Sequence, residues 1–155
     1  MDLLDPKDRA ARGTDVGEQV TGRAIDAPAT PYEESWRDFL FAEVWSRPGL
    51  DRRSRFLIAI AGSAISSGGD HLDDYIRGAL TSDALTLAEL REAALHLSVY
   101  GGWGRGGEVD RAISRVAQEY GLPPVTSAPI RAAPWDPQVR SEEGAQEFIK
   151  VMTFE

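Results

Sequence analysis

Residues 50–80 read LDRRSRFLIAIAGSAISSGGDHLDDYIRGAL and contain two apolar stretches separated by a pair of glycines. The first stretch, residues 56–65, is almost entirely apolar and follows Asp51, a residue type that caps helix starts, so we predict a buried helix there. Its small residues would let another helix approach closely. After Gly68 and Gly69 the apolar residues return at helical spacing, which predicts a second helix.

Helix start signals recur on both sides of this stretch. Thr30, a proline and then Glu33 form a capping box, and Thr86 with Glu89 repeats the pattern. Another helix is expected over residues 108–120, where a glycine and two prolines follow. No segment alternates with a period of two, so the predicted fold class is all-α.

The chain divides into three predicted parts: an N-terminal arm or helix over residues 1–28, a helical domain over residues 29–121, and a proline-rich linker with a C-terminal helix over residues 122–155. Residues 140–155 share an arginine, a glycine and a valine at matching positions with residues 9–24, either as a partial repeat or by coincidence. Apolar side chains near the C-terminus would be exposed on a lone arm. We therefore expect them to dock, and we predict a homo-oligomer.

The composition excludes several classes of function. The 155 residues carry a formal net charge of -8, which repels phosphate backbones and anionic lipid, so neither nucleic acid nor a membrane is an expected partner. The absence of cysteine removes disulfides, thiolate metal sites and thiol nucleophiles. The acidic N-terminus does not resemble a signal peptide and no segment has the length of a membrane span, so the expected localisation is cytoplasmic.

His71 and Tyr75 are the first candidates for catalysis. They are four residues apart and share one face of the predicted helix, where the imidazole could exchange a proton and the phenol could donate a hydrogen bond to an oxyanion. The alternative is structural: Asp70 caps the helix, His71 pairs with a neighbouring aspartate and Tyr75 packs. Asp70, Asp73 and Asp74 suit a helix N-terminus, and no metal site is expected.

A second candidate row consists of Glu92, His96 and Tyr100, each four residues from the next. Carboxylate, imidazole and phenol could form a hydrogen-bonded chain along one helix face. The apolar neighbours predict deep burial, so a structural histidine held by Glu92 is the alternative to a catalytic His96. If the row lines the same cavity as His71, its members would orient a substrate acid.

The segment YGGWGRGGE, residues 100–108, is rich in glycine and is predicted to be a flexible turn between two helices. It lacks the lysine and the serine or threonine of a P-loop, so a nucleotide site is not supported. Arg105 can bind a carboxylate through two parallel hydrogen bonds. We count Arg105, Trp103, Tyr100 and Glu92 as the expected substrate-binding residues.

Residues 29–61 and 75–104 resemble the carboxymuconolactone decarboxylase family, which is related to the AhpD-type alkylhydroperoxidases. The most specific pieces are EVWSRPGLDRRSR at residues 43–55 and LREAALHLSVYGGW at residues 90–103. The resemblance extends over residues 29–120. It implies an all-α fold and a homo-oligomer, commonly a trimer or hexamer, with active sites near the subunit interfaces.

The reactive positions of that family hold other residues in this chain. Peroxidase members carry a glutamate, a C-x-x-C pair and a histidine, and the resemblance places Phe56, Gly68, His71 and Tyr75 there, so thiol peroxidase activity is not expected. Decarboxylase members carry an acidic residue and a histidine spaced like His71 and Tyr75, and a proline where this chain has Gly104. The location of the pair is therefore typical of the family, whereas the residue types are new.

These observations predict a cofactor-independent acid-base enzyme of the carboxy-lyase type, a decarboxylase, isomerase or cyclase, that acts on a small lactone or carbonyl compound. His71, Tyr75 and His96 are the expected catalytic residues. The alternative is a non-catalytic oligomeric protein, with a binding or structural role, that has lost the family chemistry.

Overall fold

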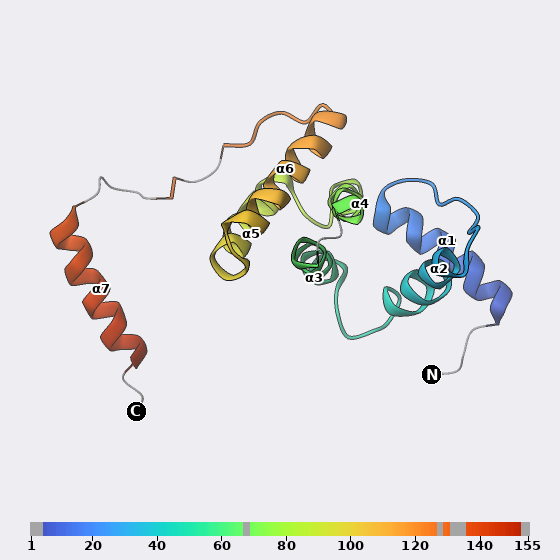
Figure 1. The fold of residues 1–155 in the computed structure, drawn as a ribbon, viewed down its shortest axis with the longest axis horizontal. Helices are drawn as coiled ribbons and strands as arrows, with labels where there is room; N and C mark the ends of the chain where they lie inside the picture. Colours follow the sequence, from blue (N-terminus) through green and yellow to red (C-terminus); the bar gives the residue numbers. More distant parts are fainter. Residues whose placement is uncertain (1–4, 67–68, 127–128, 131–135, 153–155) are drawn as a thin grey trace.

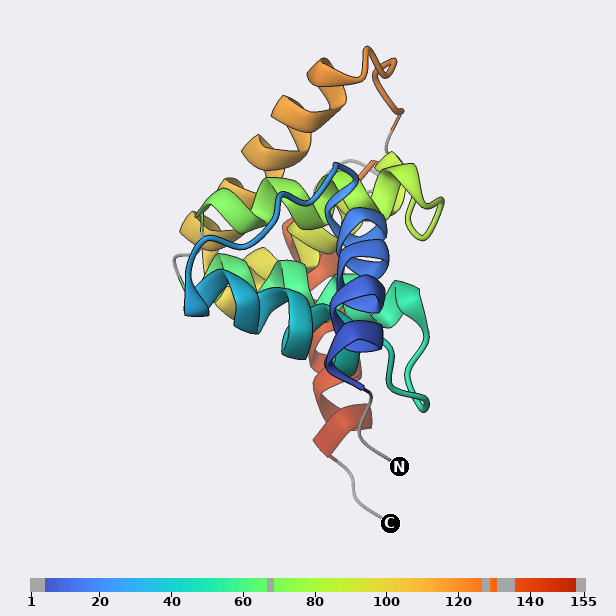
Figure 2. The same cartoon turned by 90° about the vertical axis from the view of Figure 1, so that its right-hand side faces the viewer.

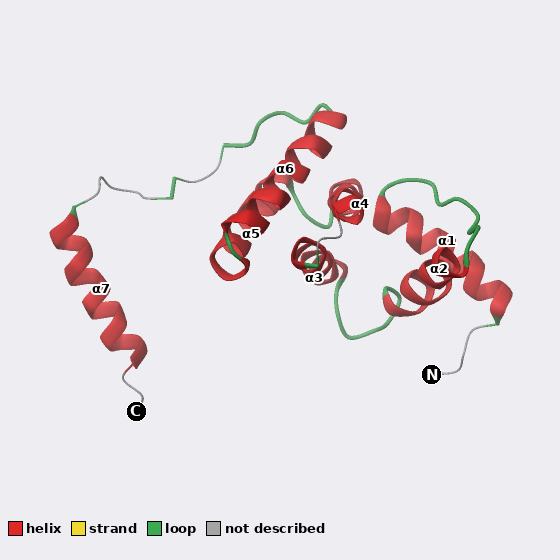
Figure 3. Ribbon diagram, viewed as in Figure 1, coloured by secondary structure: helices red, strands yellow, loops and turns green. Residues whose placement is uncertain are grey.

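The computed structural model describes residues 5–66, 69–126, 129–130 and 136–152, and every regular element within these ranges is helical (Figure 1, Figure 3). The predicted all-α fold is confirmed. None of the described helices is both long and apolar enough to cross a membrane. The elements are α1 (Pro6–Thr21), α2 (Pro31–Ser35), the π-helix η1 (Trp36–Val44), α3 (Arg52–Ile65), α4 (Gly69–Thr81), α5 (Leu87–Gly101), α6 (Trp103–Glu119) and α7 (Pro137–Met152).

Both predicted capping boxes are present. Thr30 Oγ1 accepts a hydrogen bond from the backbone N–H of Glu33 at 3.2 Å, and the Glu33 carboxylate accepts one in return from the Thr30 N–H, also at 3.2 Å. Thr86 and Glu89 make the same pair of bonds at 3.3 and 2.8 Å. These bonds satisfy backbone donors that a helix start leaves free, which explains where α2 and α5 begin.

The starts of α3 and α4 differ in how well they were predicted. Asp51 caps α3 as expected, because its Oδ1 accepts a hydrogen bond from the Ser54 N–H at 2.8 Å. Helix α4 already begins at Gly69, so Asp70 is its second residue and not its N-cap. The glycines were expected to precede the helix, but Gly69 is its first residue. Gly68 lies outside the described residues.

The helix that follows the Thr30 capping box is not a uniform α-helix. After α2 the backbone widens into η1, and the Trp45 N–H bonds to the Leu40 carbonyl, five residues back, at 3.0 Å. Such π-helical segments are rare and often occur at functional sites. Here the widened segment begins at Trp36.

Helix α4 lies at the centre of the fold and packs against α1, α3 and α6 (Figure 1). Its Ile76 is fully buried, as are Val20 of α1, Phe56 of α3 and Ile113 of α6. Helix α3 buries only one face, since Ile58 is 62% exposed on the other. The prediction of a buried helix is therefore correct for one face only, because no helix of the described chain covers the other.

Two glycines let α1 approach its neighbours closely where it runs across α4 (Figure 2). A Cβ atom at Gly78 of α4 would lie 1.9 Å from the Val20 carbonyl oxygen, and one at Gly13 of α1 would lie 2.1 Å from the Arg37 carbonyl oxygen. Any larger residue would displace backbone at either position. By contrast, Gly62 in the small-residue stretch of α3 faces open space, so the close approach predicted there does not occur at this residue.

The C-terminal helix α7 stands apart from the other helices (Figure 1). All of its described side chains are exposed, including Phe148 at 65% and Val151 at 68%. Among the described residues, α7 does not pack on the domain of its own chain. Docking onto a second copy stays a prediction.

Candidate functional site

A cavity of about 480 Å³ opens beside the first turns of α4. Its wall comes from three parts of the chain: the segment that follows α1, the continuous α2 and η1 helices, and α4. A cavity of this size suits a small organic molecule. Its charged and aromatic lining residues are Arg23, Asp26, Tyr32, Glu33, Trp36, Arg37, Phe41, His71 and Asp74.

His71 reaches this cavity from the first turn of α4 and is held there by an aromatic contact. Its ring lies against that of Trp36, with centroids 4.1 Å apart and planes inclined by 38°. Trp36 in turn contacts Tyr32 at 5.9 Å and the buried Phe41 at 6.1 Å. The imidazole therefore has a fixed wall on one side and the cavity beside it.

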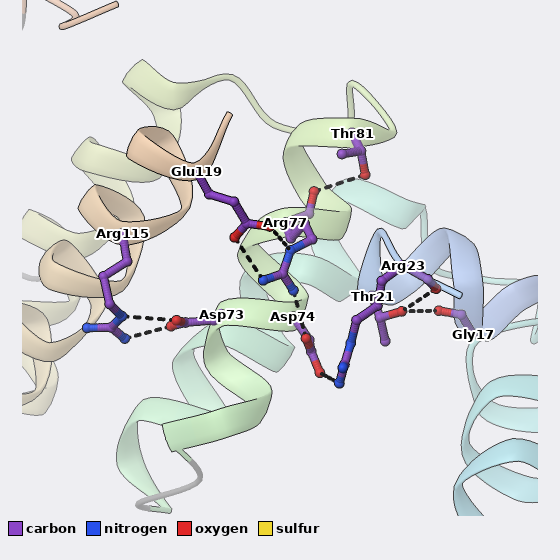
Figure 4. A network of polar contacts seen from close by, with 9 residues as sticks. All are labelled: Gly17, Thr21, Arg23, Asp73, Asp74, Arg77, Thr81, Arg115 and Glu119. Atoms are coloured by element: carbon purple, nitrogen blue, oxygen red, sulfur yellow. Dashed lines mark hydrogen bonds and ion pairs between the residues drawn. The ribbon is translucent and has the colours of Figure 1, made fainter. Parts of the chain in front are cut away.

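Arg23 lines the cavity, and a chain of ion pairs holds its guanidinium group in place (Figure 4). Its Nη2 lies 2.7 Å from Asp74 Oδ2, and Arg77 Nη1 lies 2.8 Å from Asp74 Oδ1. Arg77 also bonds to Glu119 of α6 at 3.1 and 3.3 Å. Asp74 is only 7% exposed, whereas the side chain of Arg23 is 61% exposed. The arrangement anchors Arg23 at one end and leaves the guanidinium accessible.

Arg37 supplies a second guanidinium from η1. It makes a two-bond contact with the adjacent Asp38, at 2.5 and 3.0 Å, and lies 3.7 Å from Glu34. The hydrogen bonds from Arg37 lower the pKa of the Asp38 carboxyl group below its usual value, so this pair stays charged. Within the described ranges, no three His, Asp or Glu side chains are grouped in a way that could hold a metal ion.

Tyr75 does not join His71 in the cavity, so the predicted pairing is not formed. Its ring stacks on Trp45 with centroids 5.9 Å apart, and only 7% of the residue is exposed. Burial, with smaller contributions from Asp74 and Tyr32, raises the pKa of the Tyr75 hydroxyl group. One helical turn separates the two residues, but the phenol turns toward the core and the imidazole toward the cavity.

The row of Glu92, His96 and Tyr100 lines a different hollow, on the outer face of α5. The rings of His96 and Tyr100 are 4.9 Å apart, as the predicted row requires, but His96 is exposed and the prediction of deep burial is wrong. The reason is that α5 buries the opposite face. That face consists of Leu90, Ala94 and Ser98.

Arg105 and Trp103 also lie away from His71. Arg105 lines a third hollow, and Trp103 is 73% exposed. Within the segment predicted as a flexible turn, residues 100–101 end α5 and residues 103–108 form the first turns of α6. Gly106 serves packing, because a Cβ atom there would lie 1.8 Å from Ser98 Oγ on α5, whereas one at Gly104 would meet no atom within 4 Å.

Arg23, Trp36 and Arg37 were missed by the reasoning from sequence. Each stands in an ordinary local setting: Arg23 follows Gly22, whose φ of 67° ends α1, and the other two belong to an amphipathic helix start. Nothing in these local patterns connects them with His71, because only the packing of η1 on α1 and of α1 on α4 brings them together.

A helical fold with this cavity fits the result of the sequence comparisons. The sequence model of the carboxymuconolactone decarboxylase family matches residues 30–114, which is more than half of the chain. The chain belongs to this family.

Two relatives give the class of activity found among similar proteins. The 4-carboxymuconolactone decarboxylase of Acinetobacter baylyi (strain ATCC 33305 / BD413 / ADP1) is 29% identical over 113 residues, which cover 70% of this chain and 83% of the relative. The nitrosuccinic acid decarboxylase npaB of Metarhizium robertsii (strain ARSEF 23 / ATCC MYA-3075) is 36% identical over 78 residues, which cover 48% of this chain and 54% of the relative. Both relatives are named as decarboxylases, which supports a family of the carboxy-lyase type.

Proposed function

We propose that this chain is a decarboxylase that acts on a small carboxylic acid bound in the cavity around His71. The observation that carries the proposal is the imidazole of His71, held against Trp36 in the same cavity as the guanidinium groups of Arg23 and Arg37. Such a cavity combines an imidazole, which can donate and accept a proton, with an exposed guanidinium group that can bind a carboxylate. The two relatives named as decarboxylases support the same reaction class.

The chemistry follows from these groups. In the substrate, the carbon–carbon bond to the carboxylate breaks, its electron pair moves into a neighbouring carbonyl or nitro group, and carbon dioxide leaves. The oxygen that gains the negative charge is stabilised by a guanidinium group, which is preformed and needs little reorganisation. His71 in its protonated form then donates a proton to a carbon of the resulting delocalised anion: the carbon that lost the carboxylate in a nitro acid, or the conjugated carbon beside the carbonyl in an unsaturated lactone. This scheme requires no cofactor.

The names of the two relatives suit this scheme, because a carboxylactone and a nitro acid each place a carboxylate near an electron-accepting group. A guanidinium group binds a carboxylate through two parallel bonds, so the exposed Arg23 would orient the acid while Trp36 shields one side from water. Arg37 already makes two bonds to Asp38 and would orient this side of the cavity without binding the acid in that way. We do not assign a catalytic role to Tyr75 or His96, because neither lines this cavity.

The test is release of carbon dioxide from 4-carboxymuconolactone and from nitrosuccinic acid by the purified chain. His71→Gln is expected to slow turnover about 100-fold or more if the imidazole transfers the proton. His96→Gln is the matched control, because it removes the other histidine from a separate hollow. Equal turnover by His71→Gln and the unchanged protein would refute the proposal. Binding of either acid without release of carbon dioxide would identify a binding protein that has lost the family chemistry.

A further inference from the structure

The hollow lined by Arg105, of about 300 Å³, lies between α3, α4 and α6. We call it the arginine hollow, and its main lining residues are Ser63, Leu72, Arg105, Glu108, Arg111 and Arg115. Three of these six residues are arginines on one helix, in a chain whose formal net charge is -8. Positive charge is therefore concentrated at this place against the overall charge of the molecule.

The three arginines differ in their partners. Arg105 Nη1 lies 3.2 Å from Glu108 Oε2, and Arg115 bonds to both oxygens of Asp73 at 2.6 and 3.0 Å. Arg111 makes no hydrogen bond or ion pair with any residue that the structure describes. Arg111 is therefore the arginine of the hollow to which the described chain supplies no counter-charge.

The arginine hollow is separate from the cavity around His71. Leu72 and Asp73 lie on the face of α4 that turns toward α6. His71 and Asp74 lie on the opposite face. This division is expected, because each residue of a helix is rotated by about 100° from the one before it. Figure 4 shows the same division, with Asp73 directed to Arg115 and Asp74 directed to Arg23. A ligand in one site would not contact the other.

We propose that the arginine hollow binds a small oxyanion that carries two or more negative charges, such as a phosphate-type or polycarboxylate group. Arg111 supplies the first contact, and Arg105 and Arg115 can turn from their carboxylate partners toward the same ligand, because guanidinium groups bind such oxygens through paired hydrogen bonds. The side-chain hydroxyl of Ser63 offers a neutral donor at the same site. The small volume and the overall negative charge favour a compact anion over a nucleic acid.

The experiment is calorimetric titration of the full chain with sodium pyrophosphate and, separately, with sodium citrate, in a chloride buffer of low ionic strength. Saturable binding of pyrophosphate alone indicates a phosphate-type ligand, and binding of citrate alone indicates a polycarboxylate. Binding of both indicates recognition of charge shared by the two classes. Arg111→Gln is expected to weaken the binding about tenfold or more, because it removes the charge that has no partner.

Three further variants make the assignment specific. Arg52→Gln removes an exposed arginine outside the hollow and should leave the affinity unchanged. Glu108→Gln should tighten the binding, because it removes a carboxylate that competes with the ligand for Arg105. Arg23→Gln, which changes the cavity around His71, should leave the binding of pyrophosphate unchanged. The proposal is overturned by absence of saturable binding, by Arg111→Gln binding as well as Arg52→Gln, or by loss of binding in Arg23→Gln, which would place the anion beside His71.

Discussion

The imidazole of His71 lies against the indole of Trp36, with ring centroids 4.1 Å apart and planes inclined by 38°. The contact joins α4 to the first residue of the π-helix η1. Because Trp36 also packs edge-on against the buried Phe41, it forms a rigid wall for the imidazole. In the proposed reaction this wall sets the direction in which His71 delivers its proton.

Replacing Trp36 with Leu is expected to lower kcat about tenfold, because the imidazole loses the ring that orients it. Trp36→Phe keeps an aromatic face and should retain most of the activity. Proton NMR gives a check that does not depend on turnover: the chain has two histidines, so His71→Gln identifies the His71 ring signals. These signals should shift in Trp36→Leu, and unchanged signals would contradict the contact.

Two adjacent aspartates provide a matched test of the ion pairs on α4. Asp74→Asn should lower the free energy of unfolding by about 1–3 kcal/mol, because the nearly buried carboxylate bonds to both Arg23 and Arg77. Asp73→Asn removes a more exposed pair with Arg115 and should cost less than about 1 kcal/mol. Urea denaturation measures both changes. Equal losses would show that burial does not distinguish the two pairs.

The glycines of α3 and α4 are expected to respond to alanine in opposite directions. Gly78→Ala should destabilise the fold by about 1–3 kcal/mol, because the added methyl group meets the Val20 carbonyl oxygen and pushes α1 away. Gly62→Ala meets no atom within 4 Å and should stabilise the fold by about 0.5–1 kcal/mol, because alanine loses less backbone freedom in a helix. Melting temperatures compare the two variants. A stable Gly78→Ala protein would argue against the close contact of α1 and α4.

The features that were predicted correctly from the sequence are those formed by residues close together in the chain. The Thr30 and Thr86 caps bond to residues three positions along, so their spacing alone reveals them. The contact of Trp36 with His71 depends on how η1 packs beside α4, and no spacing rule encodes it. The exposure of His96 was mispredicted for a related reason: α5 is apolar on several sides, and only the packed structure shows which side faces α6.

Alkaline pH should reveal the burial of Tyr75. A tyrosine in the unfolded chain ionises near pH 10, whereas burial raises the pKa of Tyr75 in the folded chain. Above about pH 10 the unfolded state therefore binds fewer protons than the folded state, and the stability contributed by Tyr75 falls by up to about 1.4 kcal/mol per pH unit. Tyr75→Phe cannot ionise, so its urea midpoint should fall less than that of the unchanged protein between about pH 8 and about pH 11. Parallel curves would show that the hydroxyl group is not buried in solution.

The exposed apolar side chains of α7 lead us to expect a homo-oligomer in which this helix packs on a second copy. Phe148, Val151 and Met152 are each more than half exposed, and burying such side chains contributes roughly 1.5–3 kcal/mol apiece. The linker after Tyr120 can reach about 50 Å when extended, far enough to cross to another subunit.

Phe148→Asp should therefore lower the molecular mass in light scattering, and truncation after Tyr120 should lower both the mass and the melting temperature. Glu143→Gln, on the same helix, is the control and should leave the mass unchanged. If the truncated protein keeps the mass class and the melting temperature of the full chain, α7 does not join the subunits.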